Sequence, residues 1–212
     1  KRDYYDFFNQ KNVINYIRFS DGLSTVPNFQ DFFPLSKLKL RLKKKKNYLI
    51  VNGQSADFNT GGHMPPSLFF NNSSKKTLIN EIISRHFSLW KSHRFDNKIK
   101  KKLTDKILEY ELNLKKNDLS LADLYEIWEF EERQVKFIVQ GQRIYDYFGF
   151  DWHLPLWDGE FTRFWSEMPL KFRKNKSLYI EYLRSWNYMS LFKEYDPKIH
   201  AFSGFPYNLF TL

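Results

Sequence analysis

Four apolar or aromatic residues at positions 48–51 are followed at once by small and polar ones, and then by adjacent glycines at 61 and 62. A short apolar run that ends in this way predicts a short buried β-strand leading into a loop. Ligands of open α/β sheets bind just beyond the carboxyl ends of strands, where small residues allow close approach. The pattern alone leaves two interpretations: an ordinary turn, which is the simpler one, or a ligand-binding loop that includes the carboxylate of Asp57.

Most of the other apolar residues recur three or four positions apart, which is typical of amphipathic helices. The predicted helices cover parts of residues 1–20 and about residues 34–42, 75–90, 96–114, 120–148, 159–167 and 177–191. The loop at residues 71–74 and Ser120 supply N-caps, and Gly149 is the expected stop of the longest helix. Helices therefore dominate the predicted fold beyond residue 70.

An extended segment is predicted at residues 151–158, because Pro155 prevents a helix from continuing through it. Asp158 is well placed to cap the helix that follows. A structural role is the favoured interpretation for His153 and Asp158, since this segment would anchor the helical half of the protein against the sheet.

Composition narrows the class of protein. The 212 residues suffice for one domain with a sizeable core. The chain has no cysteine, no apolar run that could span a bilayer and no signal-peptide pattern, so we expect a cytoplasmic protein without a membrane span. The net charge of +10 favours phosphate-bearing partners. The lysine runs at residues 43–46 and 98–102 are more typical of solvated helix faces than of binding sites.

Several kinds of site lack support in the sequence. None of the five histidines lies in a metal-binding pattern such as His-Glu-x-x-His. There is no Gly-x-Ser-x-Gly, Walker or Gly-x-Gly-x-x-Gly motif, so the usual hydrolase nucleophile and phosphate loops are unsupported. Glu129, Glu131, Glu132 and Arg133 fall on one predicted helix, where a solvated face with local ion pairs is the favoured interpretation. Basic and aromatic residues are abundant, but no recognisable module carries them, so nucleic acid is not the expected partner.

Three segments, in this order, resemble the synthetase domain of the asparagine synthase family. The first, Asn-Gly-Gln-Ser-Ala-Asp at residues 52–57 with Gly-Gly-His at 61–63, is similar to the family's Ser-Gly-Glu-Gly-Ser-Asp-Glu-x-x-Gly-Gly-Tyr loop. The second combines Glu132-Arg133 with His-Leu-Pro-Leu-Trp-Asp at residues 153–158, which is similar to the family's Arg-x-Pro-Phe-Leu-Asp segment. The third begins at Lys176 and resembles the segment whose lysine binds pyrophosphate. The resemblance covers about residues 20–190.

The resemblance implies an α/β fold with an adenine-nucleotide-binding parallel sheet of the HUP/PP-loop type. The whole chain, residues 1–212, would be the C-terminal part of a synthetase domain. Residues 1–70 would form the nucleotide-binding α/β portion and residues 71–212 a helical portion. The family's Ser-Gly-Gly-x-Asp-Ser loop is absent from the sequence. We therefore expect the loop upstream of this chain and the sheet to be incomplete here.

The resemblance also implies an ATP- and Mg²⁺-dependent amidotransferase that forms AMP. Its partners would be ATP, a carboxylate substrate of unknown identity, and an amine donor or a glutaminase domain or subunit. The implied sites are nucleotide contacts at Asn52, Gly53, Gln54 and Ser55, a metal ligand at Asp57, and catalytic roles for Lys176 and Gln54. The simpler alternative for Lys176 is a solvated lysine at a helix start, and for Asp57 it is a turn or cap residue.

Two departures from the family pattern keep other functions open. Gln54 stands where the family has glutamate, and His153 stands where it has arginine. A glutamine can form hydrogen bonds but cannot take up a proton at neutral pH. The alternative hypothesis is therefore a non-catalytic binding or assembly module that keeps the fold, and a third is a basic nucleic-acid-binding domain.

Overall fold

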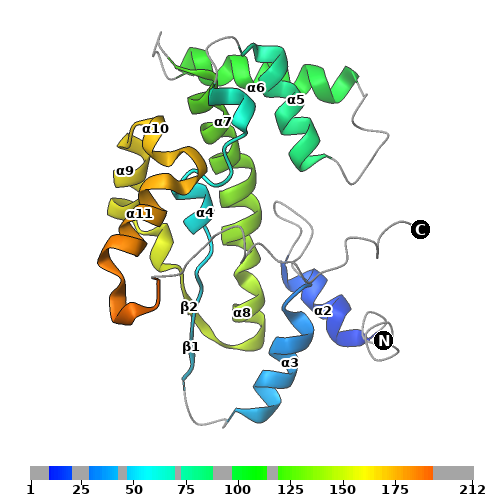
Figure 1. The fold of residues 1–212 in the computed structure, drawn as a ribbon. Helices are drawn as coiled ribbons and strands as arrows, with labels where there is room; N and C mark the ends of the chain where they lie inside the picture. Colours follow the sequence, from blue (N-terminus) through cyan, green and yellow to red (C-terminus); the bar gives the residue numbers. More distant parts are fainter. Residues whose placement is uncertain are drawn as a thin grey trace, which may run out of the picture.

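The computed structural model describes residues 10–20, 29–42, 47–69, 73–87, 97–113 and 119–192. Figure 1 shows α5, α6 and α7 gathered at one end and α2 and α3 near the other, with a long helix that contains α7 and α8 running between the two groups. The strands β1 and β2 lie beside that helix, and α9, α10 and α11 flank it. The lysine run at residues 43–46, which we interpreted as part of a solvated helix face, lies outside the described residues.

Two short parallel strands form the sheet. β1 (Leu49–Val51) pairs with β2 (Asp151–His153), with Leu49 opposite Asp151 and Val51 opposite His153. This confirms parallel strands within a helix-rich α/β fold. The prediction of a buried strand is wrong for β1, because Leu49 and Val51 are 58% and 63% exposed. Side chains of a strand alternate between its two faces, and here only the face that carries the half-buried Ile50 packs on the core.

Three helices pack together at the first end: α5 (Lys75–His86), α6 (Asn97–Asn113) and α7 (Leu121–Trp128). The predicted caps are confirmed. The Ser74 hydroxyl accepts a hydrogen bond from the Thr77 backbone N–H at 3.2 Å, and the Ser120 hydroxyl accepts one from the Asp123 backbone N–H at 3.2 Å. The Asp123 carboxylate in turn accepts the Ser120 backbone N–H at 2.9 Å, which completes a capping box.

A second, aromatic core joins α2 (Lys11–Ser20) and α3 (Phe32–Arg41) to α8 (Arg143–Phe148). Tyr16, Phe32 and Phe148 are its central rings, with ring centroids 5.2 Å apart for Tyr16 and Phe32 and 4.9 Å apart for Phe32 and Phe148. This core fixes α8, and therefore the position of β2, which follows α8 directly.

The predicted helix over residues 120–148 has the expected extent but is not uniform. Between α7 and α8 lies η3 (Glu129–Val139), a π-helical stretch. Its hydrogen bonds reach five residues back instead of four, which shifts the phase of the buried face. Gly149 ends the helix with φ +70°, as predicted for a C-terminal glycine.

The remaining elements border the carboxyl end of the sheet. After β1 come α4 (Ala56–Asn59) and the 3₁₀ turn η1 (Pro66–Phe69). The elements that follow β2 are η4 (Pro155–Trp157), α9 (Gly159–Glu167), α10 (Leu170–Arg173), η5 (Lys174–Lys176), α11 (Ser177–Trp186) and η6 (Tyr188–Ser190). Asp158 caps α9 as predicted, accepting the backbone N–H groups of Glu160 and Phe161 at 2.9 and 3.0 Å. None of the helices in the described ranges is long and apolar enough to cross a membrane.

Candidate functional site

The loops that follow β1 and β2 leave the sheet at the same edge, because the strands are parallel. The backbone N–H of Asn52 donates to the His153 carbonyl at 3.0 Å, which continues the ladder one step beyond β1. Further along, the Asn59 side-chain amide donates to the Leu156 carbonyl at 2.7 Å. The carboxyl ends of the strands are where α/β proteins bind ligands. Five of the six predicted site residues lie in the loop and short helix that follow β1, and the sixth is Lys176.

Side chains of the predicted nucleotide loop are held by the long helix. Asn52 donates to the Tyr145 hydroxyl at 3.0 Å and to the Gln142 side-chain oxygen at 3.2 Å. Gln142, which is 1% exposed, donates to the Gln54 side-chain oxygen at 2.6 Å. The side chains of Asn52 and Gln54 are therefore already engaged within the protein. Gly53 is exposed and has no atom within 4 Å of the place where a Cβ would stand, so its backbone is open to approach by a ligand.

Ser55 is a buried, conformationally unusual residue at the start of α4. Its backbone has φ +72°, in the left-handed region that residues other than glycine rarely adopt. Its hydroxyl donates to the Gln134 side-chain oxygen on η3 at 3.1 Å. This hydrogen bond holds the loop turn against the π-helical stretch.

Asp57 and Lys176 meet at this edge although they are 119 positions apart. The Lys176 Nζ donates to the Asp57 Oδ1 at 2.9 Å. The Asp57 side chain is 64% exposed, so a ligand could reach it from solvent. Lys176 directly precedes α11. Its φ is +60°, and that of Asn175 before it is +55°, so Lys176 is not part of an ordinary first turn of the helix. Asp57 lies in the first turn of α4, whose N-cap residue Ser55 makes no side-chain cap hydrogen bond.

Two glycines allow the segment around Lys176 to approach the loop closely. Gly61 has φ +86°, and a Cβ there would lie 2.4 Å from the Arg173 carbonyl oxygen. A Cβ on Gly62 would lie 3.0 Å from the Lys176 Cδ. Glycine is needed where backbones approach this closely. The Gly-Gly pair noted in the sequence therefore leaves room for the segment from Arg173 to Lys176 to lie against the loop.

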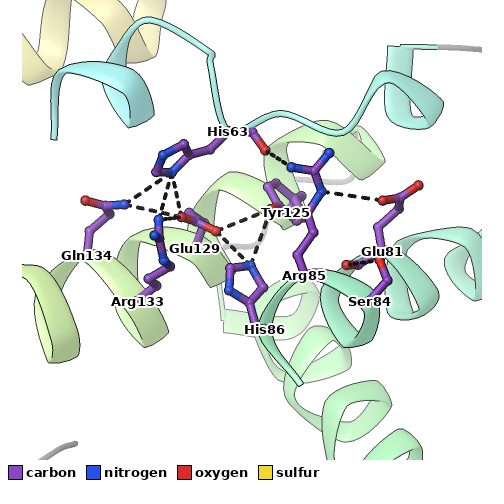
Figure 2. A network of polar contacts seen from close by, with 9 residues as sticks. All are labelled: His63, Glu81, Ser84, Arg85, His86, Tyr125, Glu129, Arg133 and Gln134. Carbon is purple, nitrogen blue, oxygen red and sulfur yellow. Dashed lines mark hydrogen bonds and ion pairs between the residues drawn. The ribbon is translucent and has the colours of Figure 1, made fainter. Parts of the chain in front are cut away.

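A buried carboxylate, Glu129, lies at the centre of a polar network behind the loop (Figure 2). Glu129 is 1% exposed and is the first residue of η3. Its Oε1 lies 2.8 Å from His63 Nδ1, 2.9 Å from Arg133 Nη1 and 3.2 Å from Gln134 Nε2. Because Gln134 also accepts from the Ser55 hydroxyl, the network connects directly to the predicted nucleotide loop.

The second oxygen of Glu129 faces residues of α5 and α7. Its Oε2 lies 3.0 Å from His86 Nε2 and accepts from the Tyr125 hydroxyl at 3.3 Å. Burial acts to raise the pKa of Glu129, but hydrogen bonds from His63 and His86 and their charges outweigh it, and the pKa lies well below its usual range. Burial and the neighbouring Glu129 charge raise the pKa of Tyr125. The network therefore favours the ionised form of a carboxylate in the interior.

The favoured interpretation of the acidic cluster on this helix, a solvated face with local ion pairs, is wrong for Glu129 and for its partner Arg133 and holds for Glu131 and Glu132. Glu131 is 45% exposed, and Glu132 pairs with Lys136 at 2.5 Å on the surface. Glu129 points inward because it lies four residues after the buried Tyr125, on the same face of the helix. The π-helical stretch then brings Gln134, five residues on, to the same side. The available signal was this spacing of four positions between Tyr125 and Glu129.

Within the described residues, no group of three or more His, Cys, Asp or Glu side chains is arranged to hold a metal ion. Asp57 is thus a single candidate ligand. Mg²⁺ is commonly held by one or two carboxylates together with substrate phosphates and water. Asp57, exposed and paired with Lys176, is a single carboxylate and would need a phosphate ligand and water to complete the coordination of Mg²⁺.

Comparisons with protein-family models, with curated proteins and with solved structures each found no match. The relationship to the asparagine synthase family therefore stays a prediction from the three sequence segments. The geometry adds that two of those segments, at residues 52–63 and around Lys176, lie against each other at the carboxyl edge of a parallel sheet.

Proposed function

We propose that this chain is part of an ATP-dependent, AMP-forming ligase that resembles asparagine synthase, with β1 and β2 belonging to an HUP/PP-loop-like sheet. The contact between Lys176 and Asp57 at 2.9 Å supports it most directly. Different segments of the resemblance had assigned the lysine to pyrophosphate and the aspartate to Mg²⁺. Their meeting beyond two parallel strands, across 119 positions of sequence, is what a shared phosphate site requires.

In the proposed reaction a carboxylate oxygen of the substrate attacks the α-phosphorus of ATP. The bond from that phosphorus to the bridging oxygen breaks, which yields an acyl-adenylate and pyrophosphate. Negative charge accumulates on the leaving group, so a cation held in place beside it lowers the barrier. Lys176 would supply that cation. Mg²⁺, when bound, would neutralise further phosphate charge, and Asp57 would hold it.

Without a ligand, the ammonium of Lys176 and the carboxylate of Asp57 neutralise each other. In the proposed complex Asp57 would turn to the metal and Lys176 to the phosphate oxygens, so each charge keeps an opposite partner. The open backbone at Gly53 would contact the nucleotide. Gln54 could not act as a base, since a glutamine does not take up a proton at neutral pH, and the acceptor substrate need not be aspartate.

One observation favours the alternative of a non-catalytic module. The amide side chains of Asn52 and Gln54 are both engaged with Gln142 on the long helix. Residues occupied in this way would stabilise the loop and would not contact a nucleotide. In that case the Asp57–Lys176 pair would be a surface ion pair, of the kind that contributes little to stability.

The test is pyrophosphate release from ATP by the full-length protein that supplies the expected upstream loop, with and without candidate carboxylates and amines. We expect release that depends on a carboxylate and on Mg²⁺. Lys176→Ala should abolish it, whereas Lys102→Ala, which removes an equal charge from an exposed site on α6, should not. Absence of ATP binding and of pyrophosphate release would exclude the ligase. Unchanged turnover in Lys176→Ala would remove Lys176 from the site.

A further inference from the structure

A cavity of about 500 Å³ lies directly behind the proposed phosphate site. Its wall includes Phe58 of α4, the residue after Asp57, and Arg173 of α10, three residues before Lys176. The cavity is therefore bordered by α4, which carries Asp57, and by α10, which ends directly before the turn that carries Lys176. A volume of this size is typical of sites for small organic ligands, which range from about 300 to 1,000 Å³.

One side of the cavity is apolar and aromatic. Phe58, Ile127 and Phe130 form this part of the wall. The Phe58 and Phe130 rings are 6.2 Å apart, and Phe130 stacks on Trp157 with centroids 5.2 Å apart. A wall fixed in this way favours a ligand with an apolar body that can pack against rings.

Two residues of the wall carry polar atoms that have no hydrogen-bond partner among the described residues. These atoms are the Thr162 hydroxyl and the Trp165 indole N–H, both on α9 and both buried. Trp165 is only 5% exposed. An unpaired buried polar group costs about 1–3 kcal/mol, so such groups in a cavity wall point to a missing partner. The indole N–H can only donate, which means that the partner must present an acceptor.

The cavity is acidic within a strongly basic protein. Asp123, Glu126 and Glu131 line it, and Arg173 is the cationic residue of the wall. Arg173 is already paired with Glu126. Glu131 accepts from the Tyr110 hydroxyl at 2.9 Å and lies 3.8 Å from Lys106 Nζ, yet its side chain stays 45% exposed. The excess of carboxylates favours a ligand that carries a positive charge.

We propose that this cavity binds a primary amine with an aromatic or other apolar body and a hydrogen-bond acceptor. The ammonium group would lie near Glu131, the body against Phe58 and Phe130, and the acceptor at the Trp165 N–H. Resting on the proposed function, this ligand is the amine that the ligase joins to its substrate. The ammonium first loses a proton to water, and the neutral nitrogen then attacks the acyl carbon. The bond from that carbon to the AMP oxygen breaks, and the nitrogen releases its second proton to water as the amide forms.

Tyramine is a suitable probe, because 4-hydroxyphenylacetamide and 4-hydroxyphenylacetate share its ring and hydroxyl but are neutral and anionic. Isothermal titration of the full chain, without ATP, should show tyramine binding about tenfold or more tightly than the amide, as expected for a charge-assisted contact. The anion should bind most weakly. Equal binding of the three compounds, or binding of none, would overturn the proposal.

Matched variants locate the bound probe. Glu131→Gln and Trp165→Phe should each weaken tyramine binding by about threefold to tenfold, the range for loss of one polar contact. Glu181→Gln removes a carboxylate from an exposed position on α11 and should leave binding unchanged. Circular dichroism melting verifies that each variant folds. If folded Glu131→Gln and Trp165→Phe bind tyramine as well as the unaltered chain, the cavity is not the site.

The outcomes separate this inference from the proposed function. Tyramine binding without any pyrophosphate release from ATP would leave the amine site standing and remove its role in amide formation. Pyrophosphate release without tyramine binding would leave the ligase standing and remove the amine site.

Discussion

Replacing Glu129 by glutamine should destabilise the fold more than the same change at an exposed glutamate. Glu129 is 1% exposed and its two oxygens receive hydrogen bonds or ion pairs from five side chains, those of His63, His86, Tyr125, Arg133 and Gln134. A glutamine of the same size keeps one acceptor oxygen but turns an NH₂ group toward donors. It also leaves Arg133 without its counter-charge.

Leaving buried polar groups without their partner costs about 1–3 kcal/mol, and Arg133, whose side chain is 33% exposed, keeps part of its hydration. We expect Glu129→Gln to lower the free energy of unfolding by about 1–3 kcal/mol at pH 7. The matched control is Glu132→Gln, three residues on. Its carboxylate pairs with Lys136 on a partly exposed surface, and such pairs contribute less than about 1 kcal/mol. Urea unfolding followed by circular dichroism measures both variants.

The difference should also depend on pH in a defined direction. The folded-state pKa of Glu129 is lowered, so its ionised form stabilises the fold fully above about 4.3, the ordinary pKa of glutamate. That stabilisation is lost as the pH falls toward the folded-state pKa. The gap between the unaltered chain and Glu129→Gln should therefore shrink below about pH 4. Equal losses for both variants, or a gap that does not change with pH, would refute the role assigned to Glu129.

Three further predictions concern the loop, its partner and a cap. Gly61→Ala should destabilise the fold by more than about 1 kcal/mol, because φ is +86° and the new Cβ would lie 2.4 Å from the Arg173 carbonyl oxygen. The control is Gly53→Ala, where the new Cβ would have open space around it. Equal thermal unfolding of the two variants would contradict the close approach. Ser120→Ala should cost about 1 kcal/mol by loss of the cap, measured by urea unfolding, whereas Ser166→Ala within α9 should cost less. Asp57→Asn and Lys176→Met should each change stability by less than about 1 kcal/mol, because the pair is partly exposed; a larger loss would indicate a structural role.

Local signals in the sequence were enough to predict most helices and their ends. Ser120 and Asp158 cap helices as their residue types and positions indicate, and Gly149 stops the longest helix in the left-handed region that glycine favours. A parallel sheet was implied only by the resemblance, and the pairing of β1 with β2 was not predicted, because the two strands are far apart in the chain. Nothing local in the apolar run at residues 48–51 indicates that two of its side chains face outward.

The polar interior of the site was missed because the acidic residues of the long helix were interpreted as one solvated face. Glu129 lies four residues after the buried Tyr125 and faces inward, whereas Glu131 and Glu132 do not. The contact of Glu129 with Gln134, five residues on, depends on the π-helical stretch, which a uniform α-helix does not predict. The contact of Asp57 with Lys176 likewise requires the close approach at Gly61 and Gly62. The sequence does not indicate which segment Gly61 and Gly62 contact. The cavity at Trp165 arises from side chains of separate helices and leaves no periodic pattern.

Binding of magnesium pyrophosphate tests the central claim most directly, because it needs neither the acceptor nor the amine. Isothermal titration of the full chain should show binding that weakens by about tenfold or more in Lys176→Ala, the value for loss of a charge-assisted hydrogen bond. It should be unchanged in Lys102→Ala, which removes an equal charge from an exposed position on α6. Binding that is absent from the unaltered chain, or equal in the two variants, would contradict a pyrophosphate site at Lys176 and Asp57.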